Sequence, residues 1–348
     1  MMAADENEVL QAIRKKMDRR GERLVILAHH YQRPEIVALG HFVGDSFALS
    51  QKAAACEKAH NIIFCGVHFM AESAAVLAAP HQVVQIPDME AGCPMADMAD
   101  PVSVSKAWDE LSAVAGSSII PLVYMNSSAE LKAFCGAHGG AVCTSSNAKT
   151  AIKWGFSKAE RVLFFPDQHL GRNSANALKI ARHQIIVWTP GKPLGGNTEQ
   201  SVRNSKIILW DGFCHVHTKF LPEHILNVRQ NNPSAKIIVH PECTEDVVNL
   251  ADASGSTDQI IRFVKAQTTG STIVIGTEIH LIERLATANP DKTIVPLLQS
   301  LCPNMYKISP EKLLAVLENP GTLNRVEIEE GVKADAKKAL QRMLELTP

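Results

Sequence analysis

A chain of 348 residues with 46% apolar residues can bury a large core and is long enough for two or three domains. Its formal net charge of −1 gives no electrostatic reason to expect nucleic-acid binding. No stretch approaches the roughly 20 uninterrupted apolar residues of a membrane span, and residues 1–20 lack the apolar centre of a signal peptide. We therefore expect a soluble cytoplasmic protein that binds neither nucleic acid nor membrane.

Short apolar runs alternate with helical segments along almost the whole chain. After a polar N-terminal helix, residues 24–28 predict a buried strand, and Pro34 and Glu35 suit the first turn of the next helix. Further strands are predicted at 61–66, 82–86, 119–124, 161–165, 184–188, 207–210, 236–239, 272–275 and 293–295. Apolar strands that alternate with helices predict an α/β fold of parallel sheets covered by helices on both faces.

The same order of features occurs three times, with a period of roughly one hundred residues, the size of a domain. Each repeat has a strand that ends in polar side chains, a hydroxyl at a plausible helix start, a strand that ends before a histidine, and a strand followed by a cysteine. The polar strand ends are His29 with Tyr31, Tyr124 with Asn126 and His240 with Glu242; the hydroxyls are Ser46, Ser145 and Thr257; the histidines are His68, His169 and His280; and the cysteines are Cys93, Cys214 and Cys302.

The repeat predicts three αβα three-layer units related by a pseudo-threefold axis. Ligands bind outside the carboxyl ends of parallel strands, so we expect the functional site at the central interface of the units. The predicted boundaries are 1–95 for the first unit with its N-terminal helix, 96–205 for the second, 206–308 for the third and 309–348 for a C-terminal helical tail. The irregular segment 189–206 is expected to be a surface excursion of the second unit.

Cysteine usage points to a metal centre. None of the eight cysteines lies in a C-x-x-C pair, which excludes zinc-ribbon and ferredoxin spacings. The repeat selects Cys93, Cys214 and Cys302, and Cys214 lies beside His215 and His217. Three thiolates at one point suit an iron–sulfur cluster that keeps one iron open, and an open metal position suits dehydration. The alternative is that the three are unrelated core cysteines.

Other repeated positions suit anion binding and proton transfer. Hydroxyls at helix starts, together with backbone N–H groups and the helix dipole, can bind a dicarboxylate or a phosphate. The alternative is that each hydroxyl only caps its helix. Side chains at the strand ends would face the same cavity, and the candidates for proton transfer among them are His29, Tyr31, Tyr124, His240 and Glu242.

Together these residues resemble the quinolinate synthase family of bacterial NAD biosynthesis. The matching segments are 27–32, 44–46, 92–95, 124–128, 143–148, 166–172, 210–217, 239–242 and 255–257. The resemblance implies three pseudo-symmetric αβα domains around a [4Fe–4S] cluster with ligands at Cys93, Cys214 and Cys302. It implies condensation of iminosuccinate with dihydroxyacetone phosphate to quinolinate, with release of phosphate and water. Some members of the family carry the last ligand in a C-x-x-C-x-x-C run, but here Cys302 stands alone, so a thiol–disulfide switch of such a run is not available.

The resemblance also assigns residue roles. It implies substrate contacts at His29, Ser46, Tyr124, Met125, Asn126, Ser145, His215, His240, Pro241, Glu242 and Thr257, with Tyr31 lining the site. Glu242 and Tyr31 are the acid–base candidates, with His29 and His240 as their partners at substrate carboxylates or hydroxyls. Because iminosuccinate is unstable, we expect an L-aspartate oxidase or dehydrogenase upstream. Two competing hypotheses are a zinc-dependent aldolase or hydrolase that uses the histidines, and a non-catalytic sensor that binds a small anion.

Overall fold

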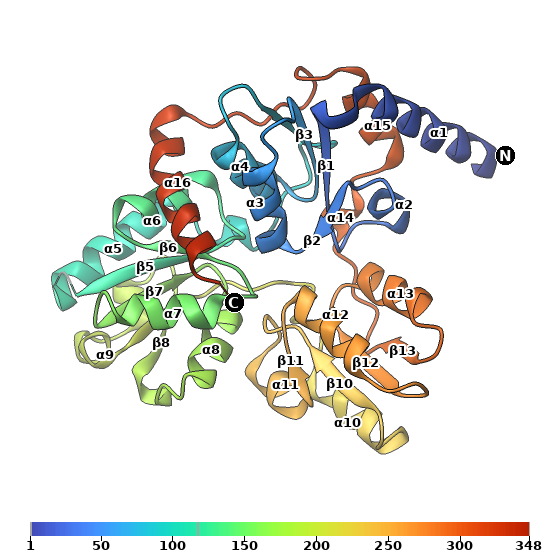
Figure 1. The fold of residues 1–348 in the computed structure, drawn as a ribbon. Helices are drawn as coiled ribbons and strands as arrows, with labels where there is room; N and C mark the ends of the chain where they lie inside the picture. Colours follow the sequence, from blue (N-terminus) through green and yellow to red (C-terminus); the bar gives the residue numbers. More distant parts are fainter. Residues whose placement is uncertain (1, 117, 348) are drawn as a thin grey trace.

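The computed structural model describes residues 2–116 and 118–347, and these residues form three parallel sheets (Figure 1). In spatial order the strands are β2 (Phe42–Gly44), β1 (Leu24–His29), β3 (Asn61–Cys65) and β4 (Val83–Gln85) in the first sheet; β6 (Ala141–Cys143), β5 (Ile119–Tyr124), β7 (Arg161–Phe165), β9 (Ile207–Trp210) and β8 (Ile185–Trp188) in the second; and β11 (Ala253–Ser254), β10 (Lys236–Val239), β12 (Thr272–Gly276) and β13 (Thr293–Pro296) in the third. Every pairing between these strands is parallel.

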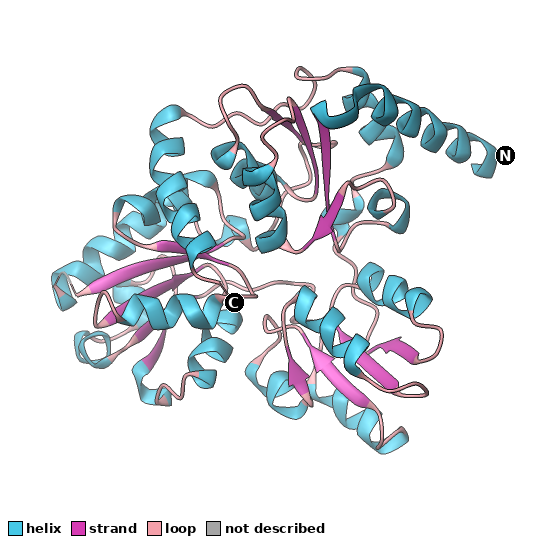
Figure 2. Ribbon diagram, viewed as in Figure 1, coloured by secondary structure: helices cyan, strands magenta, loops and turns pink. Residues whose placement is uncertain are grey.

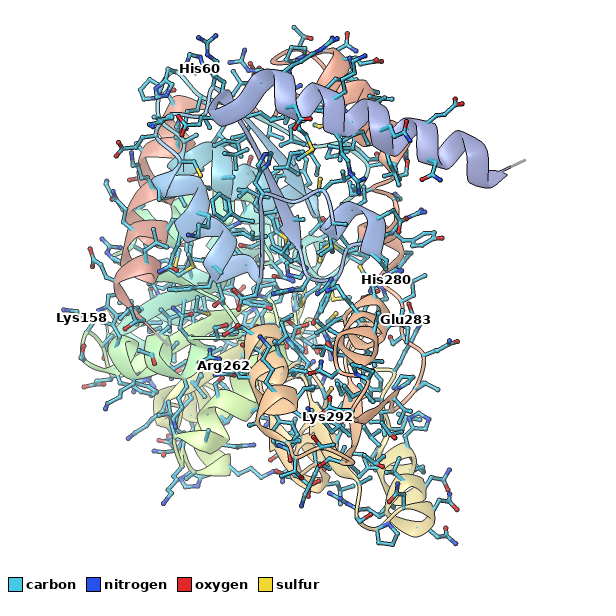
Figure 3. The ribbon with its side chains drawn as sticks, turned by 45° about the vertical axis from the view of Figure 1, so that its right-hand side comes forward. His60, Lys158, Arg262, His280, Glu283 and Lys292 are labelled. Atoms are coloured by element: carbon cyan, nitrogen blue, oxygen red, sulfur yellow. The ribbon has the colours of Figure 1, made fainter. Side chains whose placement is uncertain are left out.

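Helices flank the sheets, which confirms the predicted α/β class of αβα layers (Figure 2). The helices are α2 (Pro34–Val37), α3 (Ser46–Ala55) and α4 (His68–Leu77) in the first unit; α5 (Pro101–Ala115), α6 (Ala129–Ala137), α7 (Ala148–Phe156), α8 (Gln168–Ala177) and α9 (Glu199–Asn204) in the second; α10 (Pro222–Asn231), α11 (Glu245–Leu250), α12 (Thr257–Ala266) and α13 (Ile279–Ala288) in the third; and α1 (Met2–Arg20), α14 (Pro303–Tyr306), α15 (Pro310–Glu318) and α16 (Glu330–Glu345) around them. Charged side chains such as Lys158 and Arg262 point outward (Figure 3).

The three sheets share one topology. In each, the strand that comes first in the chain pairs on one side with a short edge strand and on the other with the third strand. Thus β1, β5 and β10 correspond, as do β2, β6 and β11, and the second sheet adds β8 beyond β9. All residues of β1 and β5 are buried, as expected for parallel strands with both faces covered.

The second sheet extends further along the chain than we predicted. We expected the third unit to begin at residue 206, but β9 lies between β7 and β8 in the second sheet. The segment 189–206 is therefore a connection within that sheet, and it contains α9. We propose that the boundary between the second and third units follows β9 and the Cys214 loop.

The tail holds the first two units together. A connection over residues 319–329 separates α15, which packs on α1, from α16, which packs on α6 and β6 of the second unit (Figure 1). Gly136 in α6 allows this approach, because a Cβ atom there would overlap the carbonyl oxygen of Asp335. The Asn147 side-chain amide donates to the carbonyl oxygens of Met343 and Leu346 at 3.3 and 2.7 Å. In the described residues, no helix is both long and apolar enough to cross a membrane.

Candidate active site

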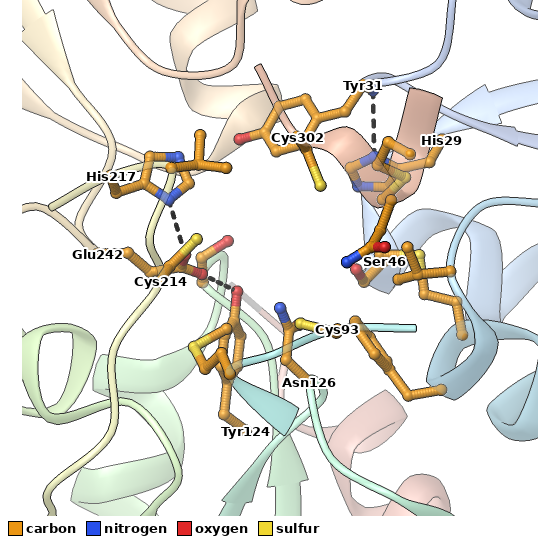
Figure 4. Close-up of a pocket in the computed structure, with 18 of the residues that line it drawn as sticks. His29, Tyr31, Ser46, Cys93, Tyr124, Asn126, Cys214, His217, Glu242 and Cys302 are labelled. Atoms are coloured by element: carbon orange, nitrogen blue, oxygen red, sulfur yellow. Dashed lines mark hydrogen bonds and ion pairs between the residues drawn. The ribbon is translucent and has the colours of Figure 1, made fainter. Parts of the chain in front are cut away.

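The carboxyl ends of β1, β5 and β10 face one cavity between the three units (Figure 4). The cavity contains about 710 Å³ of unfilled space, part of it open to solvent. Predicted residues in its wall are His29, Tyr31, Ser46, Cys93, Tyr124, Asn126, Ser145, Cys214, His215, His240, Glu242, Thr257 and Cys302. The structure therefore brings together candidates that lie far apart in the sequence.

Seven of the eight cysteines are either cavity or core residues, and the eighth, Cys56, is partly buried elsewhere. Cys93, Cys214 and Cys302 are partly buried and line the cavity from three different loops. Four others are buried in the cores: Cys65, Cys135, Cys143 and Cys243. Burial raises the pKa of Cys93 to about 12 and that of Cys302 to about 11, so these thiols carry protons at neutral pH. A metal centre bound here would have to displace those protons.

Glu242 is the centre of a buried hydrogen-bond network. The Tyr124 hydroxyl donates to its Oε1 atom, and His217 Nδ1 lies 2.8 Å from its Oε2 atom. Burial would raise the pKa of the Glu242 carboxyl, but the adjacent His217 and His240 and the hydrogen bonds from His217 and Tyr124 outweigh burial and lower the pKa. Glu242 is therefore charged at neutral pH and is a strong acceptor for both neighbours.

The network continues to Tyr31. The second ring nitrogen of His217, Nε2, lies 3.2 Å from Thr277 Oγ1, which lies 2.8 Å from the Tyr31 hydroxyl. Burial raises the pKa of Tyr31, so its hydroxyl keeps its proton at neutral pH. An unbroken chain of hydrogen bonds therefore connects two cavity tyrosines, Tyr31 and Tyr124.

His29 and His240 are held in the same way in the first and third units. The backbone N–H of Tyr31 donates to His29 Nδ1 at 3.1 Å, and that of Glu242 donates to His240 Nδ1 at 3.4 Å. Burial lowers the pKa of both imidazoles, to about 3 for His240. Each ring is therefore neutral with its proton on Nε2, which makes Nε2–H a hydrogen-bond donor for a ligand.

The three predicted helix-start hydroxyls occupy different positions. Ser46 and Thr257 are the first residues of α3 and α12, but Asp45 and Ser256 cap these helices, so the capping alternative is wrong for both hydroxyls. The expectation that Ser145 begins a helix is also wrong. It lies in a turn before α7, which is closed by a hydrogen bond from the Thr144 N–H to Asn147 Oδ1 at 2.8 Å.

Two predicted substrate contacts do not line the cavity. Met125 is fully buried, and its sulfur accepts a hydrogen bond from Ser73 Oγ. Pro241 lies against an outer cleft between the second and third units, and its carbonyl accepts from Asn173. Neither side chain is therefore placed to contact a ligand in the cavity.

Sequence reasoning did not assign His217 and Thr277, which link Tyr31 to Glu242. His217 carried one signal, since it belongs to the same Cys-His-x-His segment as His215. Both histidines line the cavity, but His217 is the buried one and carries the hydrogen bonds. Thr277 follows β12 without a distinctive motif, so no feature of the sequence selects it.

The donor set fits two kinds of metal centre. Besides the three cavity thiols, Cys214, His217 and Glu242 have ligand atoms within 4.8 Å of one another, and three donors with an open fourth position suit a catalytic zinc ion. However, both ring nitrogens of His217 already have partners, in Glu242 and Thr277. Metal binding at His217 would break one of these bonds, whereas the thiols of Cys93 and Cys302 take no part in the network.

Comparison with known proteins gives matches along nearly the whole chain. Residues 11–345 match the family model described as "Quinolinate synthetase A protein". The chain is 48% identical to a quinolinate synthase of Corynebacterium glutamicum, over 99% of this chain and 89% of that protein. It is 46% identical to those of Herpetosiphon aurantiacus and Halalkalibacterium halodurans, over 97% of this chain and 92% and 93% of theirs. The matches include the segments that form the cavity in all three units.

Proposed function

Because the chain belongs to the quinolinate synthase family, an enzyme family of NAD biosynthesis, we propose that it condenses iminosuccinate with dihydroxyacetone phosphate to quinolinate, releasing phosphate and water. The observation that carries the proposal is a hydrogen-bond chain between two cavity tyrosines, next to three thiols in the same cavity. The cavity thus has groups for proton movement and for holding a metal centre.

The cavity offers uncharged donors to anionic substrates. Iminosuccinate has two carboxylates and dihydroxyacetone phosphate has a phosphate. The Nε2–H groups of His29 and His240 and the hydroxyls of Ser46 and Ser145 can donate to these oxygens. The Asn126 amide lines the same wall and can donate or accept.

The hydrogen-bond chain can take one proton from a substrate and return it. With one proton in each bond, Tyr31 donates to Thr277, Thr277 to His217 Nε2, and His217 Nδ1–H to the charged Glu242. Tyr124 donates to Glu242 from the other side. All donors therefore point towards Glu242, so a proton that arrives at either tyrosine can pass inward to the carboxylate. Ring formation requires such removals and returns of protons.

The thiols of Cys93, Cys214 and Cys302 would hold a [4Fe–4S] cluster. Their separate loops allow an approach to one centre from three sides, and Pro94 and Pro303 restrict the backbone next to two of them. When bound, the cluster would supply one iron with an open position that acts as a Lewis acid towards a substrate hydroxyl or carboxylate.

The second candidate is a zinc-dependent aldolase, favoured by the grouping of Cys214, His217 and Glu242. Anaerobic purification with metal analysis separates the two. Broad absorption near ~400 nm and about four irons per chain support the cluster. A colourless protein with one zinc supports the aldolase, and a metal-free protein that binds dicarboxylates would support an anion sensor.

The wider setting follows from the substrate. Iminosuccinate is unstable in water, so we propose that an L-aspartate oxidase or dehydrogenase supplies it, and that the enzyme works in the cytoplasm. The test of the reaction itself is formation of pyridine-2,3-dicarboxylate from dihydroxyacetone phosphate and freshly generated iminosuccinate. No product from the iron-loaded protein would contradict the proposal.

A further inference from the structure

One residue from each unit contributes to a hydrogen-bonded junction, which we define as Asp45, Ser146 and Ser256; Asp45 itself lines the cavity, and the two serines lie behind its wall. Ser146 Oγ lies 2.6 Å from Asp45 Oδ2 and 2.9 Å from Ser256 Oγ. The Ser146 hydroxyl faces both oxygens as a donor, and its single proton goes to the closer, charged acceptor, the Asp45 carboxylate. The bond to the carboxylate is charge-assisted and therefore stronger than a bond between neutral groups.

The outer members of the junction also fix the starts of two helices. Asp45 Oδ1 accepts from the Ala48 N–H at 2.9 Å, and Ser256 Oγ accepts from the Gln259 N–H at 3.4 Å. Asp45 is 6% exposed and Ser256 is fully buried, so neither has water as a ready replacement partner. The same two side chains therefore cap α3 and α12 and join these helices to the second unit.

Each junction residue is adjacent in the chain to a hydroxyl that lines the cavity. Asp45 precedes Ser46, Ser146 follows Ser145, and Ser256 precedes Thr257. Beyond Ser145 and Ser146 lies the outer cleft between the second and third units. No sheet continues from one unit to the next among the described residues. The relative placement of the three cavity hydroxyls thus depends on side-chain contacts such as this junction.

We propose that Asp45, Ser146 and Ser256 are positioning residues that set the spacing of the three cavity hydroxyls for a ligand with two carboxylates. The inference rests on the proposed function, because that function supplies the dicarboxylate. A rigid ligand with fixed carboxylates loses hydrogen bonds when donors shift by about 1 Å. The junction should therefore affect ligand affinity more strongly than overall stability.

The test uses the anaerobically prepared holoenzyme and the probe pyridine-2,3-dicarboxylate. Ser146→Ala should raise the Kd about tenfold or more, because it removes both bonds and leaves a buried carboxylate oxygen without its donor. Asp45→Asn keeps the shape of the side chain and its cap on α3. It replaces the acceptor Oδ2 with an NH2 group, which can donate to the Ser146 hydroxyl, so that Ser146 then donates only to Ser256. We expect it to raise the Kd only about threefold. Ser146→Thr, which keeps the hydroxyl, should restore most of the affinity.

The control is Ser205→Ala, which removes a buried hydroxyl bonded to the Val202 carbonyl at 2.8 Å, away from the cavity. Equal losses of affinity in Ser205→Ala and Ser146→Ala, or wild-type affinity in Ser146→Ala, would overturn the inference. If Ser146→Ala does not fold, Ser146→Cys, whose thiol is only a weak donor to the Asp45 carboxylate, replaces it, and wild-type affinity in that variant overturns the inference equally.

Amide hydrogen exchange without ligand separates this inference from the proposed function. Ser146→Ala should accelerate exchange at the first turns of both α3 and α12, whatever the protein binds. If the wild type does not bind the dicarboxylate, the proposed function fails. The exchange data then still show whether the junction positions the starts of α3 and α12. Unchanged exchange at both helix starts would show that the junction does not position them.

Discussion

The first and third units present the same strand end with different side chains. In both, a histidine accepts through Nδ1 from the backbone N–H two residues later. That later residue is Tyr31 in the first unit and Glu242 in the third, and the two lie in one hydrogen-bond chain. The repeated backbone orients an imidazole in each unit, whereas the position two residues later carries a neutral donor in one and an anionic acceptor in the other. A repeated scaffold can thus produce an asymmetric site.

The largest expected effect tests what the two units have in common, a cavity thiol. Cys93→Ala and Cys302→Ala should each abolish activity and lose most of the iron, because three thiolates leave no spare ligand. The matched controls are Cys65→Ala and Cys243→Ala, since these thiols lie in the cores of the same two units. The iron content of the variants and controls is compared after anaerobic purification. Full iron content and activity in Cys93→Ala or Cys302→Ala would show that the replaced cysteine is not a cluster ligand.

The next effect tests the difference between the units. Glu242→Gln removes the acceptor towards which all donors of the chain point, and we expect kcat to fall about 10³-fold. Tyr31→Phe removes one end of the chain and leaves the bond between Tyr124 and position 242, so we expect a smaller loss, about 10²-fold. Steady-state kinetics with both substrates measure kcat for the two variants and show which loses more. A larger loss in Tyr31→Phe would show that the carboxylate is not the centre of the relay.

The hydroxyls of the two units should also differ. Ser46→Ala should raise the Kd for pyridine-2,3-dicarboxylate about tenfold with little change in kcat, since one hydrogen bond to a charged group is worth roughly 1.5–3 kcal/mol. The Thr257 hydroxyl donates to the Tyr31 hydroxyl at 3.3 Å. Thr257→Val should therefore lower kcat as well as affinity. Identical kinetic profiles for the two variants would mean that Thr257 does not act through Tyr31.

The smallest effect concerns a position where the first unit has His30 and the third has Pro241. Burial, followed by the charge of Arg284, lowers the pKa of His30 to about 4, although Asp258 opposes this. The unfolded chain binds a proton below about pH 6.5, while the folded protein does not until about pH 4. The contribution of neutral His30 to the free energy of unfolding is therefore fully present above pH 6.5 and is lost as the pH falls towards 4.

Between pH 7 and pH 5 this loss is roughly 2 kcal/mol. His30→Asn should remove that part of the pH dependence, which urea unfolding at the two pH values can measure. The variant also loses the bond from Arg284 to His30 Nδ1 at 2.9 Å, so its stability at pH 7 should be lower as well. If the free energy of unfolding of the variant still differs between pH 7 and pH 5 as much as that of the wild type, His30 is not the cause of the pH dependence.

Much of the architecture could be predicted from the sequence because parallel strands buried on both faces are continuous apolar runs. All ten predicted strands occur, and β5, β7, β9 and β10 have the predicted bounds. The missed strands, β2, β6 and β11, are edge strands of two or three residues, which are too short to form such a run. The boundary at residue 206 was misplaced because strand order in a sheet does not follow chain order: β9 lies between β7 and β8.

The site was predicted as far as repeated positions reveal it. Strand-end side chains and cavity cysteines recur in register, so the sequence selects His29, His240 and the three thiols. His217 and Thr277 have no counterpart in that register, and their roles come from contacts that only the folded chain makes, including the bond from Thr277 to Tyr31 of the first unit. The position of Ser145 was misjudged because Asn147 closes a turn with Thr144, which delays the start of α7.

The contact between Asn147 and α16 also has a consequence for biosynthesis. The amide of Asn147 reaches carbonyl groups 196 and 199 residues later in the chain. A ribosome makes the chain from the N-terminus at about 5–20 residues per second, so the turn that carries Ser145 emerges long before its partners. The strands of the second unit can pair during that interval, but this wall of the cavity is completed only when Leu346 has been made. The site is therefore completed only near the end of translation. A ribosome that stalls within α16 would leave a folded second sheet and an incomplete cavity wall.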